Sequence, residues 1–253
     1  MLCCLLLTVT SFVAATETQI VDGSPATNCE FPSIVHLIVY NQPSDNLVGV
    51  CGGTLIDSTH VLTAAHCLDG NVRGVKVNIG TNNKWHSGPE SRNVSRIVKH
   101  NLYEHSNIVT KNDIAILTLN RPVKEGSCVQ FAQMARQGET FGTSRCIAAG
   151  WGKFSLGGDS PDELYKVSLT AVPHDVCKRT SLMNIADGVL CAGDFVAGGA
   201  ATCKGDSGGP LYCPNAHRQM VLAGVTSFGY NCFEGINAFT DVAYFRAWIR
   251  NNM

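Results

Sequence analysis

Short runs of β-forming residues, each bounded by turn residues, recur along most of this 253-residue chain. Such a succession is typical of an all-β sandwich or barrel. No internal repeat or low-complexity segment is visible in the sequence. The predicted strands span 34–40, 49–56, 75–79, 114–119, 146–149, 165–171 and 220–226.

The end of the chain follows a different period. Val242, Phe245, Trp248 and Ile249 fall on one face at helical spacing. This pattern predicts a terminal helix that packs on the β structure.

The composition is that of a globular protein, with 45% hydrophobic and 15% charged residues. A chain of this length can bury most of its apolar surface. The formal net charge is −1 and no long basic run occurs, which argues against nucleic acid or an anionic membrane as a partner.

Residues 1–15 are typical of a secretory signal peptide. The stretch 2–8 is largely apolar, and Val13, Ala14 and Ala15 supply small residues for cleavage. The apolar run is too short to span a bilayer, and polar residues follow it at once. We therefore expect a secreted, extracellular protein without a membrane anchor.

The cysteines agree with secretion. Of the 12 cysteines, Cys3 and Cys4 leave with the predicted signal peptide, so ten remain. An even number in a secreted chain implies disulfides, although spacing does not decide among the many pairings. Zinc binding is the weaker alternative, because no closely spaced Cys/His pairs of the finger type occur.

The stretch 205–210 (GDSGGP) places Ser207 in a glycine-rich turn, directly after Asp206. Glycine permits backbone conformations that other residues avoid and lets another chain approach closely. A hydroxyl on such a turn is accessible, and the backbone N–H groups of Gly205 and Ser207 can converge on one point. That geometry holds an oxyanion after a serine attacks a carbonyl. The alternative is an ordinary turn built from Gly, Asp and Ser.

A serine at its free pKa is a poor nucleophile and needs a base. His66 is the best candidate, because it lies near the end of an apolar, strand-like run (VLTAAHC, 61–67) and the other histidines lie in polar or mixed contexts. Asp113 directly precedes an apolar strand, where a buried carboxylate is costly unless it has a function or a partner. Taken singly, these two are more often a core histidine and a strand-start residue. With Ser207, in the order His, Asp, Ser, they match one chain order of the catalytic triad.

Six motifs in this order resemble the serine proteases of the trypsin and chymotrypsin family, over almost all of 20–253. The resemblance implies two six-stranded antiparallel β-barrels, chymotrypsin-like, with a C-terminal helix and a catalytic cleft between the barrels. It places His66 and Asp113 in the first barrel and Ser207 in the second. The motifs are IVDG at Ile20, CGGTLI at Cys51, TAAHC at Thr63, NDIAIL at Asn112, GWG at Gly150 and GDSGGP at Gly205.

The resemblance also implies an activity, that of a secreted serine endopeptidase, a hydrolase that cuts peptide bonds through an acyl-enzyme. Ser207 is then the nucleophile, His66 the general base and later acid, and Asp113 the residue that orients His66. Ser227 is expected to hydrogen-bond Asp113, and the N–H groups of Gly205 and Ser207 form the oxyanion hole. We expect a monomer that needs no cofactor and binds protein or peptide substrates and protein protease inhibitors.

Five disulfides are expected. Cys29 and Cys128 are not at the positions of the commonest family bridges, and Cys29–Cys128 is assigned by elimination. The pairs that the resemblance implies are Cys51–Cys67, Cys146–Cys213, Cys177–Cys191 and Cys203–Cys232, the last across the substrate pocket.

By resemblance, the floor of the substrate pocket is Ala201, where trypsin-like members carry an aspartate that holds Lys or Arg. A buried cation would lack a partner there, so the residue before the scissile bond is expected to be uncharged, as for a chymotrypsin- or elastase-like enzyme. Asn237 replaces a frequent glycine and should narrow or polarise the interior, whereas Gly229 leaves the mouth open. The predicted pocket residues are Ala201, Thr202, Ser227, Phe228, Gly229 and Asn237, with Lys204 at the rim.

Two alternatives stay open. A catalytically inactive homologue acting as a binding protein typically has a triad position replaced, whereas all three are intact here. A narrow-specificity regulatory or toxin protease is the second alternative, and the sequence does not settle the physiological substrate.

The stretch from Ile20 resembles the new N-terminus that family zymogens expose on cleavage. We therefore predict an activation propeptide over 16–19 and a protease domain over 20–253. The freed ammonium of Ile20 should pair with Asp206 and order the oxyanion amides. Gln19 departs from the Lys or Arg at which family zymogens are usually cut, so a trypsin-like activator is not expected, and self-cleavage is the alternative.

Two further expectations concern the first barrel. Asn93 begins a glycosylation sequon, Asn-Val-Ser, which we place in a polar loop. Many family members bind calcium in an early loop, but Thr81 stands where the first acidic ligand is expected and only Glu90 follows. We predict no calcium or other metal.

Overall fold

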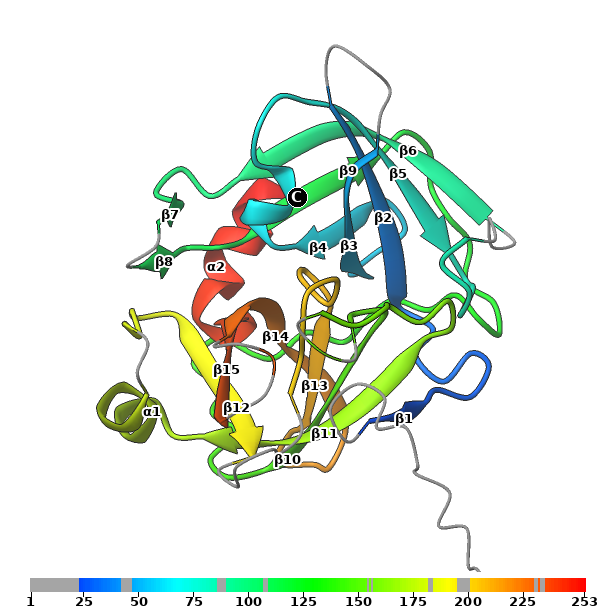
Figure 1. Cartoon of the computed structure of the whole chain (residues 1–253). Helices are drawn as coiled ribbons and strands as arrows, with labels where there is room; N and C mark the ends of the chain where they lie inside the picture. Colours follow the sequence, from blue (N-terminus) through cyan, green and yellow to red (C-terminus); the bar gives the residue numbers. More distant parts are fainter. Residues whose placement is uncertain are drawn as a thin grey trace, which may run out of the picture.

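The computed structural model describes residues 23–41, 47–85, 90–106, 109–153, 155, 157–181, 184–194, 201–229, 232 and 235–253 (Figure 1). The predicted signal peptide, the predicted propeptide and Ile20 lie outside these residues. In the described part of the chain, no helix has the length and apolar character needed to span a bilayer.

Six antiparallel strands close the first barrel, in the order β2-β3-β4-β9-β6-β5. Alternate residues of β2, Val35, Leu37 and Val39, lie in its core, because successive side chains of a strand point to opposite faces. The strands are β2 (Ile34–Asn41), β3 (Leu47–Leu55), β4 (His60–Thr63), β5 (Val72–Ile79), β6 (Glu90–Lys99) and β9 (Ala115–Leu119).

The second barrel also has six antiparallel strands, in the order β11-β10-β13-β14-β15-β12, and pairing of β11 with β12 closes it. Leu169, Leu211 and Phe239 are fully buried in its core. The short strand β1 (Ser24–Pro25) adds to β11 from outside the barrel. The barrel strands are β10 (Arg145–Gly150), β11 (Tyr165–Val172), β12 (Val189–Asp194), β13 (Pro210–Pro214), β14 (Met220–Gly229) and β15 (Gly235–Asp241).

The predicted terminal helix is confirmed as α2 (Val242–Asn252), which lies across the two barrels (Figure 1). Asp241 caps it by accepting hydrogen bonds from the backbone N–H groups of Ala243 and Tyr244. Val242, Phe245 and Ile249 of α2 pack into one cluster with residues of both barrels, such as Ile116 of β9 and Leu222 of β14. The helix therefore helps to fix one barrel against the other.

Smaller elements complete the described fold. A short 3-10 helix, η1 (Ala65–Leu68), follows β4, and α1 (His174–Thr180) precedes β12. The two-residue strands β7 (Glu104–His105) and β8 (Thr110–Lys111) pair with each other.

The barrels also meet backbone to backbone. The N–H group of Gly52 in β3 donates to the carbonyl oxygen of Ser207, at 2.8 Å. A Cβ atom at Gly52 would lie 2.8 Å from the Cα of Gly209, closer than real Cβ contacts allow. Glycine is therefore required at Gly52 for the turn that carries Ser207 to lie against the first barrel.

The predicted all-β fold with two six-stranded barrels is confirmed, and each predicted run overlaps a strand. One placement was wrong. Asn93 lies in the long strand β6, paired with Lys76 of β5, and not in a loop. Strand β6 escaped prediction because it carries mainly polar side chains and lacks a clear apolar alternation. Asn93 is exposed, and its glycosylation stays a prediction.

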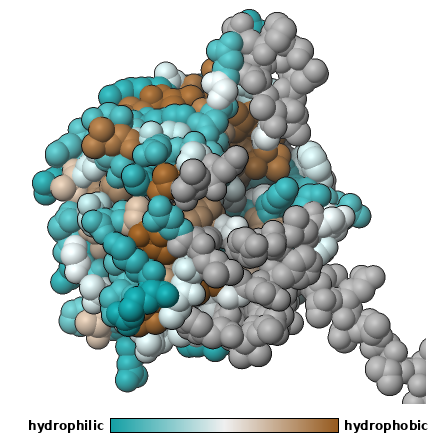
Figure 2. All heavy atoms as spheres, turned by 60° about the vertical axis from the view of Figure 1, so that its left-hand side comes forward, coloured by the Kyte–Doolittle hydropathy of each residue, from teal (hydrophilic) through white to brown (hydrophobic). Residues whose placement is uncertain are grey.

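Among the residues that carry a colour in Figure 2, most are hydrophilic, and the hydrophobic ones form separate patches. The apolar side chains of the described chain are gathered mainly in the barrel cores and in the cluster under α2.

Candidate active site

Two neighbouring strands of the first barrel bring His66 and Asp113 together. Strand β4 leads into η1, which carries His66, and Asp113 comes just before β9. Strands β4 and β9 are paired, with Thr63 opposite Ala115, so these ends lie side by side. Asn112 takes a positive φ of 51°, which turns the chain just ahead of Asp113.

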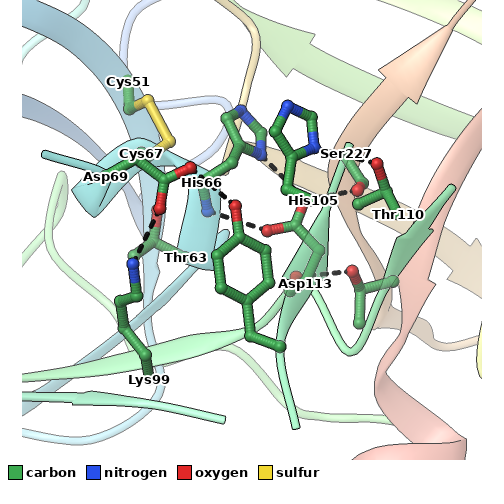
Figure 3. A network of polar contacts seen from close by, with 12 residues as sticks. Cys51, Thr63, His66, Cys67, Asp69, Lys99, His105, Thr110, Asp113 and Ser227 are labelled. Atoms are coloured by element: carbon green, nitrogen blue, oxygen red, sulfur yellow. Dashed lines mark hydrogen bonds and ion pairs between the residues drawn. A yellow bond between two sulfur atoms is a disulfide. The ribbon is translucent and has the colours of Figure 1, made fainter. Parts of the chain in front are cut away.

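The Asp113 carboxylate holds His66 at two points (Figure 3). Its Oδ2 lies 2.7 Å from Nδ1 of the imidazole, and its Oδ1 accepts from the backbone N–H group of His66 at 2.9 Å. The hydroxyl of Ser227, on β14 of the second barrel, donates to the same Oδ2. These contacts fix the ring orientation and favour the tautomer that carries its proton on Nδ1.

Burial and hydrogen bonding shift the pKa values of His66 and Asp113 in opposite directions. Burial works against the charged imidazole, but the hydrogen bond and negative charge of Asp113 outweigh it and raise the pKa of His66. Burial likewise works against the Asp113 carboxylate, which is only 2% exposed. Its hydrogen bonds and the charge of His66 outweigh burial and lower the pKa of Asp113.

A further layer of contacts surrounds this pair, and no motif of the sequence indicates it. The hydroxyl of Thr240 donates to the carbonyl oxygen of Asp113 at 2.6 Å. The ring of His105 stacks on that of His66, with 6.0 Å between the ring centroids (Figure 3). Asp69 accepts from Tyr103, at 2.7 Å. Only the fold could reveal these positions, because no short motif contains Thr240, His105, Asp69 or Tyr103.

The turn that carries Ser207 packs against η1 and its disulfide. Gly208 has a φ of 76°, and a Cβ atom there would overlap the side chain of Thr63 and approach Cys67 Sγ to 3.2 Å. Ser207 therefore lies beside the segment that carries His66. The hydrogen bonds of the described residues do not include one between His66 and the Ser207 hydroxyl. In unliganded enzymes such bonds are often long and shorten only when substrate binds.

Two backbone N–H groups of the same turn have no hydrogen-bond acceptor in the described part of the chain. No described residue accepts a hydrogen bond from the N–H group of Gly205 or of Ser207. Gly205 has a φ of 105°, a conformation that side chains disfavour. The adjacent backbone is tied down, because the N–H group of Lys153 donates to the carbonyl oxygen of Lys204 at 2.8 Å.

Asp206 lies behind this turn and is buried, with 3% of its surface exposed. Its carboxylate accepts from the backbone N–H groups of Gly152, at 2.8 Å, and Cys203, at 2.9 Å. Burial raises the pKa of Asp206 to about 6, although these two hydrogen bonds work against that rise. No cationic side chain of a described residue pairs with it.

A cavity of about 350 Å³ opens beside Ser207. Two predicted pocket residues, Ala201 and Asn237, are not on its wall but are buried, at 2% and 3% exposure. Asn237 Oδ1 accepts from the backbone N–H group and the hydroxyl of Thr202, at 2.9 and 2.7 Å, so Thr202 covers it. The described residues that line the cavity are Thr202, Cys203, Lys204, Ser207, Thr226, Ser227, Phe228, Gly229 and Cys232.

Five disulfides join the ten cysteines of the described residues in the expected pairs. Cys51–Cys67 ties β3 to η1, next to His66, and Cys203–Cys232 borders the cavity beside Ser207. The others are Cys29–Cys128, Cys146–Cys213 and Cys177–Cys191.

Among the described residues, one group of potential metal ligands stands close together, formed by Cys51, His66 and Cys67. Both cysteines are consumed in a disulfide, so their sulfur atoms are not available as thiolate ligands. The residues named for calcium have other contacts: Thr81 donates to the carbonyl oxygen of Asn83, and Glu90 pairs with Arg92.

The two six-stranded barrels, with the C-terminal helix α2 across them, form the chymotrypsin fold. The family model described as Trypsin matches residues 20–249. "Trypsin, alkaline C" of Manduca sexta is 33% identical over 95% of this chain and 93% of its own length. "Chymotrypsin-like elastase family member 3B" of Homo sapiens is 31% identical over 94% and 90%. "Kallikrein 1-related peptidase b3" of Mus musculus is 35% identical over 81% and 80%. The chain belongs to the trypsin family of serine proteases.

The contact between Asp113 and His66 predicts how the imidazole titrates. Asp113→Asn removes the charge that opposes burial, so the pKa of His66 should fall below its ordinary value. Nuclear magnetic resonance titration of the ring protons measures it. Asp57→Asn is the matched control, since Asp57 contacts His60 and not His66, and should leave the His66 titration unchanged. An unchanged pKa of His66 in Asp113→Asn would contradict this account.

Proposed function

We propose that the protein is a serine endopeptidase that hydrolyses peptide bonds through an acyl-enzyme, with Ser207, His66 and Asp113 as its catalytic residues. The observation that carries the proposal is the packing of the Ser207 turn against η1, whose His66 is held by Asp113. Membership of the trypsin family supports protein or peptide substrates.

In the proposed reaction, Ser207 Oγ attacks the carbonyl carbon of the scissile bond while His66 Nε2 takes the hydroxyl proton. The oxygen of the tetrahedral intermediate accepts from the N–H groups of Gly205 and Ser207, which lack acceptors among the described residues. His66 then gives its proton to the leaving amine. Water then attacks the carbonyl carbon of the acyl-enzyme while His66 takes its proton. The bond to Ser207 Oγ breaks, and His66 returns the proton to regenerate the Ser207 hydroxyl. Asp113 stays ionised throughout and stabilises the imidazolium.

Ser207→Ala should lower kcat by about 10⁶-fold, because removing one member disables the whole unit. The thermal unfolding midpoint should stay near that of the wild type. Ser168→Ala is the matched control, since Ser168 is exposed on β11 of the same barrel, and it should keep wild-type activity. The measurement is kcat on peptide substrates with each purified variant. Wild-type turnover by Ser207→Ala, with contaminating protease excluded, would refute the mechanism.

For the residue before the scissile bond, we propose an uncharged, apolar side chain of medium or large size. Phe228 supplies an apolar wall, and no acidic residue is among the described residues that line the cavity. Lys204 lines the cavity and its charge repels an incoming Lys or Arg. Asn237 is engaged by Thr202, so its carbonyl oxygen is not free to hold a cation.

Peptides that differ only in this residue, with Phe, Leu, Gln or Arg, should be compared by kcat/KM. The apolar substrates should exceed the Arg substrate by at least about tenfold, because a desolvated cation without a partner is costly. An Arg peptide that exceeds the others tenfold would overturn the proposed specificity and leave the proposed mechanism intact.

We also propose secretion and activation by cleavage before Ile20. The disulfides of the structure are typical of oxidising, extracellular compartments. Asp206 supports the activation step, because it is buried without a cationic partner among the described residues. The ammonium of Ile20 would supply that partner, and the pair would order the adjacent oxyanion amides.

The proposed pair sets a pH window. In the uncleaved chain the pKa of Asp206 is raised to about 6, so folding favours its protonated form. The stability that this protonated form contributes is full below the pKa of the unfolded chain and is lost as pH rises through about 6. Pairing raises the pKa of the Ile20 amine, so in the cleaved chain the stabilisation fades as pH rises through that raised value. Activity should therefore decline reversibly at alkaline pH. N-terminal sequencing beside a pH profile tests this, and full activity of a chain that begins at Thr16 would refute it.

A further inference from the structure

A second cavity, of about 200 Å³, lies next to the proposed oxyanion hole and takes no part in the proposed reaction. Its wall combines residues of both barrels with the turn before Ser207. The described residues that line it are His36, Val50, Lys84, Trp151, Lys153, Ser160, Lys204 and Gly205. Three of them are lysines and none is acidic, so the cavity is cationic.

Lys84 is the most deeply placed of these cations, with its side chain only 5% exposed. Its ammonium donates to the carbonyl oxygen and the hydroxyl of Ser160, at 3.2 and 2.8 Å. It also forms a salt bridge, at 3.7 Å, with the carboxylate of Asp162, which is 63% exposed and not part of the cavity wall. The charge of Lys84 is therefore held in place but only partly neutralised.

Lys153 and Lys204 face the same cavity from the second barrel. Among the described residues, no carboxylate lies within salt-bridge distance of either ammonium. Like charges that share one small space repel one another, so an anion between them lowers the free energy of all three lysines.

His36 gives an independent indication of a ligand. It lies in β2 with 2% of its surface exposed, and neither ring nitrogen has a hydrogen-bond partner among the described residues. Its ring contacts Trp151, with 5.3 Å between centroids, on the cavity wall. Burial, and then the charge of Lys84, lower the pKa of His36 to about 4, so the ring is neutral and keeps one N–H donor. A buried donor without an acceptor is costly, and an anion in the cavity would supply the acceptor.

The position of the cavity indicates which anion reaches it. In the proposed reaction, the carbonyl that Ser207 attacks directs its oxygen at the Gly205 N–H group, and the side chain of the same residue enters the 350 Å³ cavity. Lys204 lines both cavities, and Gly205 lines the second one. The leaving-group side of the peptide then runs away from the first cavity, and the second cavity adjoins the first at Lys204, which lines both.

We propose that this cationic cavity binds an acidic side chain of the substrate on the leaving-group side, so that Asp or Glu is preferred at the first or second residue after the scissile bond. This proposal rests on the proposed endopeptidase function. Lys153 and Lys204 supply the charge at the entrance, while Lys84 and His36 supply donors in the interior.

The test uses the activated enzyme and peptides identical up to the scissile bond. The first or second residue after that bond is Asp, Asn, Glu, Gln or Lys in turn, and kcat/KM is measured for each. The acidic peptide should exceed its amide counterpart by about tenfold at one of the two positions, as expected for a charge-assisted hydrogen bond, and the Lys peptide should be the poorest. Equal values for the acids and their amides would overturn the proposal, whereas no hydrolysis of any peptide would contradict the proposed function itself.

Variants connect the preference to the cavity. Lys153→Gln should remove most of the preference for the acid over the amide, measured as the ratio of the two kcat/KM values within the same variant. Lys178→Gln is the matched control, since Lys178 is exposed on α1, and it should keep the preference. Preference retained in Lys153→Gln and also in Lys84→Met, with both variants folded by their thermal unfolding, would contradict the assignment.

Free anions distinguish a substrate subsite from a general anion site. Acetate and inorganic phosphate are added to the hydrolysis of the amide and acidic peptides. Competition confined to the acidic peptide, and lost in Lys153→Gln, is the expected result. If phosphate binds and Lys153→Gln abolishes that binding while acids and amides are cut equally well, the cavity holds a free anion and the proposal fails.

Discussion

A single buried carboxylate joins the parts of the proposed site. Asp113 accepts hydrogen bonds from the backbone and the ring of His66 in the first barrel, and from the hydroxyl of Ser227 in the second. Its own carbonyl oxygen accepts from Thr240, also in the second barrel. An isolated buried carboxylate is costly, whereas one with several donors and a basic ring beside it is stabilised in its charged form. The orientation of His66 and the relative position of the barrels therefore depend on the same residue.

Two glycines position the turn that carries Ser207 where the two barrels meet. Gly52 and Gly208 have no room for a Cβ atom, so the turn that carries Ser207 lies against β3 and the Cys51–Cys67 disulfide. Asp206 is buried behind the turn against Gly150 and Gly152, with backbone N–H groups as its partners among the described residues. The site is thus positioned by backbone contacts and buried charge, and the surrounding barrels supply the rigid frame.

The sequence predicted the parts of this arrangement that short motifs encode. His66, Asp113 and Ser207 each stand in a distinctive context, and the alternation of β2 and the helical period of α2 follow from the faces that they bury. Strand β6 was missed because its outward face is polar and a strand with few apolar residues has no readable period. Ala201 and Asn237 are buried, and Asn237 is bonded to Thr202, a contact between residues far apart in the sequence that no local pattern indicates. The cationic cavity gathers Lys84, Lys153 and Lys204 with His36, residues far apart in the sequence, so no local pattern could indicate it.

The central claim is that Ser207 is the nucleophile and that the His66–Asp113 pair activates it. The most direct measurement is labelling of the activated protein with a serine-directed organophosphorus reagent, followed by intact mass and peptide mapping. The account predicts one label per molecule, on Ser207, with loss of peptide hydrolysis in proportion to labelling and greatly slowed labelling in His66→Ala. Labelling on another residue with loss of hydrolysis, or full hydrolysis by a protein labelled on Ser207, would contradict it.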